Sequence, residues 1–336
     1  MIDWVSAILP CNHDATRLLD GFVMSFDALG QQQWICNKTL SIEGSYSSKI
    51  QIKSVPNTVN QIYITGNPTK FLQGHNLFGR NDLVGIMGDF FDVLLEHDIG
   101  LTPDQHQYDA IQSGHYSLTR VDVNESWHLK DRFEVLAFIR ALGQTANMKR
   151  RGTFQYSGDT AYIGKNSRRW SAKCYSKGTE ILAKGHKLPD QLNIPEMLQY
   201  ADKSLRLELV LRQLELKRRG FDIASNWNED TAKMLLQSMV LDNLELSDNM
   251  ALPDEILYTL PNKLRSTYIL WKEGEDLRQS LSKPTFYRHR TQLLSFGIDI
   301  FVAQETKRNN IVPMIRYLQA EPAGIPVWAY HKGLVA

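Results

Sequence analysis

The sequence predicts an α+β protein with a largely antiparallel central sheet flanked by helices, followed by a smaller, mainly helical C-terminal domain. Apolar and polar residues alternate over 40–55, 61–67 and 115–127, as they do in half-buried strands. Helical spacing occupies 81–100 and 131–146, between and after these strands. This order favours a mostly antiparallel sheet.

The chain of 336 residues is long enough for two domains. A helix is expected near 195–202, and the segment 204–220 begins as a strand and becomes helical after Arg212. Composition then becomes acidic and helical near 222–255. We therefore expect a catalytic domain over 1–222 and a helical domain over 223–336.

Composition is ordinary for a soluble protein, with 43% hydrophobic and 22% charged residues. No apolar run approaches the ~20 residues that cross a bilayer. Asp3 stands where a signal peptide would be basic. The expected location is therefore the cytoplasm, with no membrane partner. Three cysteines without a CxxC pair are expected to be reduced.

Charge is balanced overall but clustered locally. A net charge of +1 argues against a protein that coats nucleic acid indiscriminately. Local basic clusters can still contact phosphates, although each one alone is typical of a solvated surface. The clusters are Lys149-Arg150-Arg151, Lys165 with Arg168-Arg169, Lys217-Arg218-Arg219, and Arg288-His289-Arg290.

The segment 160–180 predicts two short strands joined by a basic turn. Alternation along the second strand places Lys173, Tyr175 and Lys177 on one face. Ammonium groups beside a phenol lower the cost of the phenolate and attract a phosphodiester. Tyr175 is thus a candidate nucleophile in phosphate chemistry, with Lys177 beside it. The DNA-contact candidates are Lys173, Lys165, Arg168 and Arg169.

Two further strands each present an arginine and a carboxylate on one face. Arg120 and Asp122 share a face in one strand, and Arg206 and Glu208 share a face in the other. If these strands lie side by side, both carboxylates come close to Tyr175. Paired carboxylates suit Mg²⁺ or Mn²⁺, which would polarise a scissile phosphate. The competing interpretation is a pair of structural ion pairs.

His75 lies between Gly74 and Asn76, in a loop before a helix. Its imidazole could complete a metal site with Asp122 and Glu208, contact phosphate, or cap local structure. The sequence contains no GxxxxGK[ST] motif, so use of ATP by this chain is not expected.

The segment 282–297 predicts a basic amphipathic helix. Ser282 can cap it, Pro284 fits its first turn, and Gly297 would end it. The side chains expected inward are Phe286, Leu293 and Leu294, and those expected outward are Tyr287, Arg288, Arg290 and Gln292. This pattern resembles a helix-turn-helix recognition helix, with Arg288 and Arg290 on DNA. An ordinary amphipathic helix fits equally well.

Taken in order, several motifs resemble a known family. They are the opening MIDW, then NPTKFLQGHNLFG, LTRVDV, YIGKNSRRWSAKCYSKGTE and LRLELVLR, and finally FYRHRTQLLSFGI and NNIVPMIRYL. Together they resemble the II/X-type replication proteins, the rolling-circle initiators of filamentous phages and related plasmids.

The resemblance implies a site- and strand-specific HUH-type endonuclease acting at a replication origin in the bacterial host. It places Tyr175 as the nicking tyrosine, which forms a 5′-phosphotyrosyl link and leaves a 3′-hydroxyl for a host polymerase. A host helicase is an expected partner. The chain lacks a His-hydrophobe-His triplet, so Glu180 remains a reserve metal ligand. The alternatives are a non-catalytic, sequence-specific DNA-binding protein and a relaxase-like transfer nickase.

Overall fold

The computed structural model describes the chain except residues 45, 246–256, 258, 273–274, 297 and 302–313. Two compact units result: Met1–Leu246 together with Leu318–Ala336, and Ser247–Tyr317. The expected boundary at 222 does not coincide with this division. Helix α8 (Thr231–Met239) contacts strand β6 of the first unit and buries Leu235 and Leu236. The C-terminal residues also return to the first unit.

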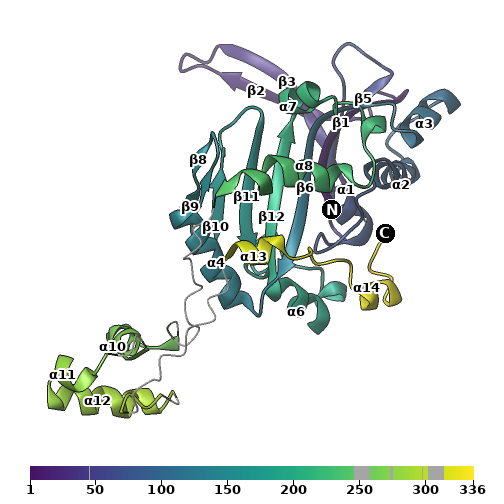
Figure 1. Cartoon of the computed structure of the whole chain (residues 1–336). Helices are drawn as coiled ribbons and strands as arrows, with labels where there is room; N and C mark the ends of the chain where they lie inside the picture. The colour runs from purple at the N-terminus through teal and green to yellow at the C-terminus, as the bar shows by residue number, and fades with distance from the viewer. Residues whose placement is uncertain (45, 246–256, 258, 273–274, 297, 302–313) are drawn as a thin grey trace. The chain divides into compact units, whose positions relative to one another are not determined.

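The first unit is organised around a ten-stranded sheet (Figure 1). Its order is β2-β3-β4-β5-β1-β6-β12-β11-β10-β9, and the paired strands run antiparallel. The strands are β1 (Ile2–Pro10), β2 (Leu19–Phe26), β3 (Gln32–Glu43), β4 (Lys49–Ser54), β5 (Gln61–Gly66), β6 (Ser117–His128), β9 (Gln155–Ser157), β10 (Thr160–Ile163), β11 (Trp170–Ser176) and β12 (Ser204–Arg212). A small second sheet joins β13 (Leu244–Glu245), β7 (Asn147–Met148) and β8 (Gly152–Thr153).

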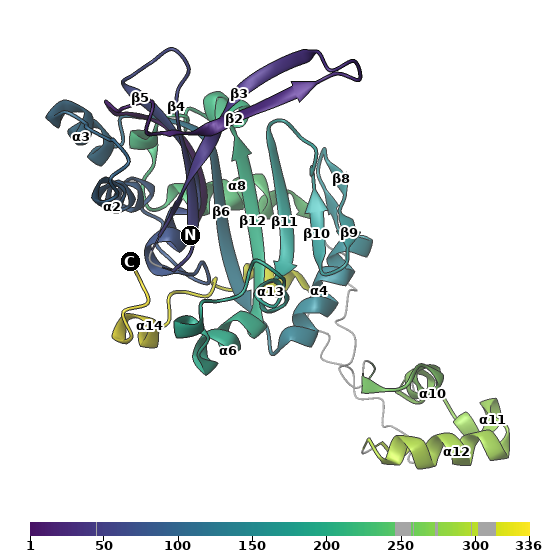
Figure 2. The same ribbon diagram turned by 180° about the vertical axis from the view of Figure 1, so that it is seen from behind.

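Helices flank this sheet. Helix α8 crosses in front of the strands in Figure 1 and lies behind them in Figure 2. Helix α4 packs against β10 and β11. The other helices of the first unit are α1 (Pro68–Gln73), α2 (Leu83–Glu96), α3 (Gln105–Gln112), α4 (Arg132–Thr145), α5 (Lys177–Glu180), α6 (Pro195–Lys203), α7 (Gln213–Arg219) and α14 (Val327–His331), while α13 (Met314–Gln319) spans the boundary between the units.

The three strands that carry the site candidates lie side by side. Strand β12 pairs with β11 on one edge and with β6 on the other. Opposite residues include Tyr175 with Arg206, and Lys173 with Glu208. Directly opposed side chains share a face and lie close together. The adjacency expected from sequence is therefore present.

Strand β12 ends where the sequence predicts. Its apolar side chains at Leu205, Leu207 and Leu209 are buried, and α7 begins directly after Arg212. Gly220 ends that helix with a positive φ of 75°, which glycine adopts without strain. The α+β class, the antiparallel sheet and the helical C-terminal region are confirmed.

Helices described within the second unit include α10 (Asn262–Lys272), α11 (Leu277–Ser280) and α12 (Lys283–Leu294). Ser282 is the N-cap of α12, and Phe286 and Leu293 are buried in a small core. Leu294, expected inward, is 47% exposed because it lies on the outer side of the last turn. Residue 297 lies outside the described residues.

Among the described residues, no helix combines the length and apolarity that crossing a bilayer requires.

Candidate active site

Tyr175 lies on β11 and is almost fully buried, with 5% of its surface exposed. Its hydroxyl donates a hydrogen bond to Glu208 Oε2 at 3.1 Å. Burial, followed by the negative charge of Glu208, raises the pKa of Tyr175 well above its ordinary value. The structure therefore holds a neutral phenol beside a carboxylate, rather than a phenolate stabilised by lysines.

Lys173 contacts both Glu208 and Tyr175. Its ammonium lies 3.0 Å from Glu208 Oε1 and 4.8 Å from the centre of the Tyr175 ring. Burial lowers the pKa of Lys173, but Glu208, helped by the charges of Asp3 and Glu180, raises it overall. Lys173 is thus a charged partner of Glu208 that covers one face of the tyrosine.

Three carboxylates gather on β1, β6 and β12. Glu208 is buried, and its pKa is raised to about 7 by burial and by the nearby charges of Asp3 and Asp122, against the attraction of Lys173. Asp122 is also buried, and burial raises its pKa although Arg120 opposes the rise. Close, desolvated like charges make ionisation costly. Such a cluster costs stability, which is typical of a functional site.

Arg120 holds Asp122 in a two-pronged ion pair. Arg120 Nε donates to Oδ1 at 2.8 Å, and Nη2 donates to Oδ2 at 2.6 Å. The other arginine behaves differently: Arg206 donates to the carbonyls of Asn76 and Leu77, each at 2.5 Å, and not to Glu208. The expected Arg-x-acid ion pair therefore forms on β6 and not on β12.

Lys177 does not continue the strand. Strand β11 ends at Ser176, which caps the short helix α5 by accepting from the Thr179 amide at 3.3 Å, so Lys177 starts that helix. The fully buried ammonium pairs with Glu180 and donates to Asn76 Oδ1 at 2.8 Å. Burial and the charge of Arg206 lower the pKa of Lys177 to about 8.

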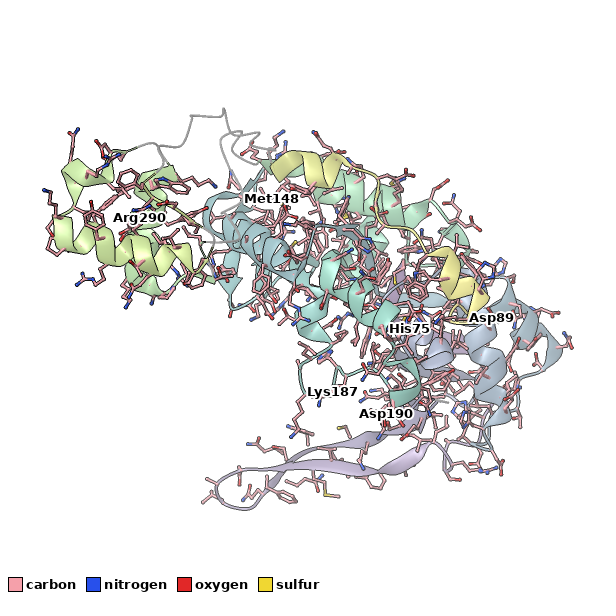
Figure 3. All side chains as sticks on the ribbon, turned by 90° about the horizontal axis from the view of Figure 1, so that it is seen from below. His75, Asp89, Met148, Lys187, Asp190 and Arg290 are labelled. Carbon is pink, nitrogen blue, oxygen red and sulfur yellow. The ribbon has the colours of Figure 1, made fainter. Side chains whose placement is uncertain are left out.

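His75 is fully buried and both of its ring nitrogens have partners. Nε2 donates to the carbonyl of Leu334 at 2.9 Å, while Nδ1 accepts from the amide of Leu77 at 3.3 Å. Burial lowers the pKa of His75 to about 4. Figure 3 shows His75 close to the C-terminal segment that carries α14. The structure does not bring the His75 imidazole together with Asp122 and Glu208 as a metal ligand, because its Nε2 is hydrogen-bonded to Leu334 in the C-terminal segment.

The residues present fit a divalent cation through carboxylates alone. The described part of the chain contains no preformed group of three or more His, Cys, Asp or Glu side chains that could hold a metal ion. Mg²⁺, however, needs only one or two protein carboxylates and completes its shell with water and phosphate. Asp122 and Glu208 would meet that requirement by exchanging their present partners, Arg120 and Lys173, for the cation. Asp3 lies beside them. The mutual repulsion of these groups is what a bound cation would relieve.

The basic residues that are candidates for DNA contact differ in their exposure and in the ion pairs that they already form. Lys165 and Arg168 are exposed in the turn between β10 and β11. Arg169 is paired with Glu215 at 2.9 Å. In the second unit Arg288 is exposed, whereas Arg290 forms an ion pair with Asp299 at 2.7 Å.

Comparisons with known proteins identify the family of this chain. Residues 1–230 match the family model that describes the N-terminal part of a phage replication-associated protein, and residues 252–335 match the model of its C-terminal part. The replication-associated protein of Enterobacteria phage I2-2 is 38% identical over 97% of this chain and 95% of its own length. This chain belongs to the phage replication-associated protein family. The II/X family predicted from the motifs is thereby confirmed.

A solved structure, that of a rolling-circle replication initiator protein from Geobacillus stearothermophilus, aligns with 76% of this chain and 88% of its own length, at 10% identity and a TM-score of 0.35.

Two further residues of this family member belong to the site and were not singled out from the sequence. Asp3 accepts hydrogen bonds from Asn67 and, at 2.8 Å, from Asn76 Nδ2, and it contributes charge to the Glu208 cluster. Asn76 thereby links Asp3 to Lys177. The signal for Asp3 in the sequence was an acidic residue inside the apolar first strand. The signal for Asn76 was its position next to His75.

Proposed function

We propose that this replication-associated protein initiates rolling-circle replication by nicking one strand at a phage or plasmid origin in the host cytoplasm, with Tyr175 as nucleophile. The observation that carries the proposal is the buried hydrogen bond from the Tyr175 hydroxyl to Glu208, within a carboxylate cluster whose ionisation is suppressed.

In the proposed step, Tyr175 Oη attacks the phosphorus and the bond from phosphorus to the 3′ oxygen breaks. The phenolic proton passes to water, and the leaving 3′ oxygen takes a proton from Lys177. The products are a 5′-phosphotyrosyl link and a free 3′-hydroxyl for a host polymerase. The reverse attack by a 3′-hydroxyl rejoins the strand, and the covalent link conserves the bond energy without ATP.

Supporting residues hold these groups in place. Asn76 and Glu180 orient the ammonium of Lys177, so that its charge is fixed before DNA arrives. Asp122 and Glu208 would hold Mg²⁺ or Mn²⁺, and the cation would neutralise charge on the scissile phosphate. Lys165 and Arg168, which are exposed in the turn between β10 and β11, would contact the DNA backbone.

The direct test uses the purified full chain, supercoiled DNA that carries the phage origin, and Mg²⁺ or Mn²⁺. We expect nicked circles and a protein–DNA adduct whose mass maps to the peptide containing Tyr175. Tyr175→Phe should form no adduct and still bind origin DNA. Tyr162→Phe is the matched control, because Tyr162 lies opposite Lys173 on β10 and should remain active.

An adduct in Tyr175→Phe would overturn the assignment of the nucleophile. Origin binding by wild type without cation-dependent nicking would instead establish a non-catalytic DNA-binding protein. Nicking confined to a conjugative transfer origin would establish a relaxase.

A further inference from the structure

Strands β2 and β3 extend beyond the sheet as a two-stranded ribbon. Residues 32–39 of β3 pair with β2, whereas residues 40–43 pair with β4. The outer part, residues 21–37, is called the arm below. Figures 1 and 2 show it leaving the sheet, and in Figure 3 it projects away from the body of its unit with side chains on both sides.

The arm exposes an unusual number of large apolar side chains on both of its faces. They are Phe22 (54% exposed), Val23 (44%), Met24 (46%), Phe26 (58%), Leu29 (85%), Trp34 (51%) and Ile35 (47%). A two-stranded ribbon is only marginally stable in water by itself. Large apolar side chains that are exposed together on one short segment mark an interaction site.

The arm is not built for phosphate. Between residues 21 and 37 the sequence contains one charged residue, Asp27. Its carboxylate is engaged in the turn, where it accepts from the amides of Leu29 and Gln31 at 2.9 and 2.8 Å. DNA and anionic lipid surfaces both attract clustered lysine and arginine, which the arm lacks. The composition therefore favours an apolar protein surface as the partner.

The arm itself is the best match for such a surface. Elsewhere in the first unit, the large apolar side chains that are exposed among the described residues are scattered, such as Val59, Phe133 and Leu214, apart from Val327 and Tyr330, which share α14. Strand β2 is also the first strand of the sheet order, so its outer edge offers unpaired backbone groups. The β2 side chains along this edge, Phe22, Val23, Met24 and Phe26, expose on the order of 350 Å² of apolar surface. A standard interface buries ~800 Å² per partner, so a contact along this edge corresponds to a weak, concentration-dependent association.

We propose that two copies of this chain associate through their arms, with β2 of one copy pairing antiparallel with β2 of the other. A two-fold axis makes such a contact self-complementary. With the axis at Met24, Phe22 of each copy lies opposite Phe26 of the other, so the aromatic rings pack across the interface. Both edges gain the backbone hydrogen bonds that water now supplies.

The first measurement is the mass of the purified chain by sedimentation, without DNA. We expect a dimer at micromolar concentration. Met24→Glu should shift the protein to monomer by at least tenfold in dissociation constant. Because Met24 is half exposed, its replacement should leave the thermal unfolding of each unit unchanged. The matched control is Val59→Glu, which places the same charge on another exposed site and should remain dimeric.

The second measurement locates the two-fold axis. In a Cys36→Ser background, single cysteines replace Val23, Met24 or Ser25, while the buried Cys11 and Cys174 stay in place. Mild oxidation should cross-link at least one of these three positions, because residues on the axis have Cα atoms about 4.5–5.5 Å apart, within disulfide range. Leu29→Cys at the tip should not cross-link, since antiparallel pairing separates the two tips.

A monomeric wild type, a dimer that survives Met24→Glu, or cross-linking confined to Leu29 would each overturn the proposal. Binding of the monomer to lipid vesicles would overturn it in favour of a membrane surface. The oligomeric state is measured without DNA. A monomeric protein would therefore contradict the dimer proposal without contradicting the proposed nicking activity. If both hold, the dimer brings two copies of Tyr175 to one origin.

Discussion

Replacing Glu208 with glutamine should stabilise the metal-free protein at alkaline pH. The environment raises the pKa of Glu208 from 4.5 to about 7, and each pKa unit corresponds to ~1.36 kcal/mol. The fully ionised carboxylate therefore costs the fold about 3 kcal/mol. Glutamine resembles the protonated acid in shape and cannot ionise, so Glu208→Gln removes this cost.

The sign follows from which state loses its proton first. Below pH 4.5 Glu208 is protonated in both the folded and the unfolded chain, so wild type and variant should be equally stable. As pH rises from 4.5 to about 7, the unfolded chain ionises first and wild type loses stability. Above about pH 7 the difference is constant at its full value.

The assay is urea unfolding of the full chain in EDTA at pH 5 and pH 8, followed by the fluorescence of tryptophans in the first unit. The variant should gain little at pH 5 and about 3 kcal/mol at pH 8. Mg²⁺ should then stabilise wild type, by about 2.7 kcal/mol at a hundredfold excess over its dissociation constant, and leave Glu208→Gln unaffected. The change in unfolding free energy caused by the mutation and the change caused by Mg²⁺ thus both measure the cost of ionising Glu208.

Glu215→Gln is the matched control with the opposite sign. Burial opposes its ionisation, but Arg218 and Arg219 lower the pKa of Glu215 to about 2, so its charge stabilises the fold at neutral pH. Glutamine there should destabilise the protein. A Glu208→Gln variant that is no more stable than wild type at pH 8 would refute the reasoning and identify Glu208 as a structural ion-pair partner of Lys173.

Three further outcomes are expected. Lys177→Met should lower the single-turnover nicking rate by about 10²–10³-fold with origin affinity unchanged, as measured with preformed complexes; a loss of affinity alone would contradict its catalytic role. Arg288→Ala should weaken origin binding and reduce the slope of log affinity against log salt by about 1 in fluorescence anisotropy, whereas a salt slope equal to wild type would remove Arg288 from the DNA contact. His75→Ala should lower the free energy of unfolding in urea by about 1–3 kcal/mol, because the Leu334 carbonyl loses its hydrogen-bond partner. Nicking by this variant should still depend on the cation, whereas Asp122→Asn should abolish that dependence. A changed metal requirement in His75→Ala would show that His75 is a metal ligand.

Strand alternation predicted the centre of the site because period-2 patterns depend only on local sequence. The Arg120–Asp122 pair and the proximity of Glu208 to Tyr175 both follow from it. The same reasoning placed Lys177 on the strand, which was wrong because Ser176 caps a helix one residue earlier. A serine that ends a strand and starts a helix has no signature in alternation.

The environment of His75 could not be predicted, because its partner Leu334 is 259 positions away along the chain. Contacts of this separation depend on how the C-terminal segment folds back after the second unit. Nor does sequence alone show that Asp3 and Asn76 share a hydrogen bond across β1 and the loop after α1. Such contacts arise from the packing of several elements together.

The C-terminal segment should therefore be required for the catalytic unit, although it follows the second unit in the chain. Leu334 and Ala329 pack in one core cluster with Leu77 and Phe78, and the amide of Ala336 donates to Gln73 at 3.0 Å. These contacts hold the loop that carries Asn76, the partner of Lys177.

Leu334→Ala should cost about 2–5 kcal/mol in unfolding of the first unit. It should also lower the nicking rate of the protein that remains folded, because Asn76 loses its support. Leu294→Ala is the control, since that leucine is 47% exposed in the second unit and its removal should affect neither quantity. A destabilised Leu334→Ala protein with a wild-type nicking rate would show that the loop keeps its geometry without the C-terminal segment.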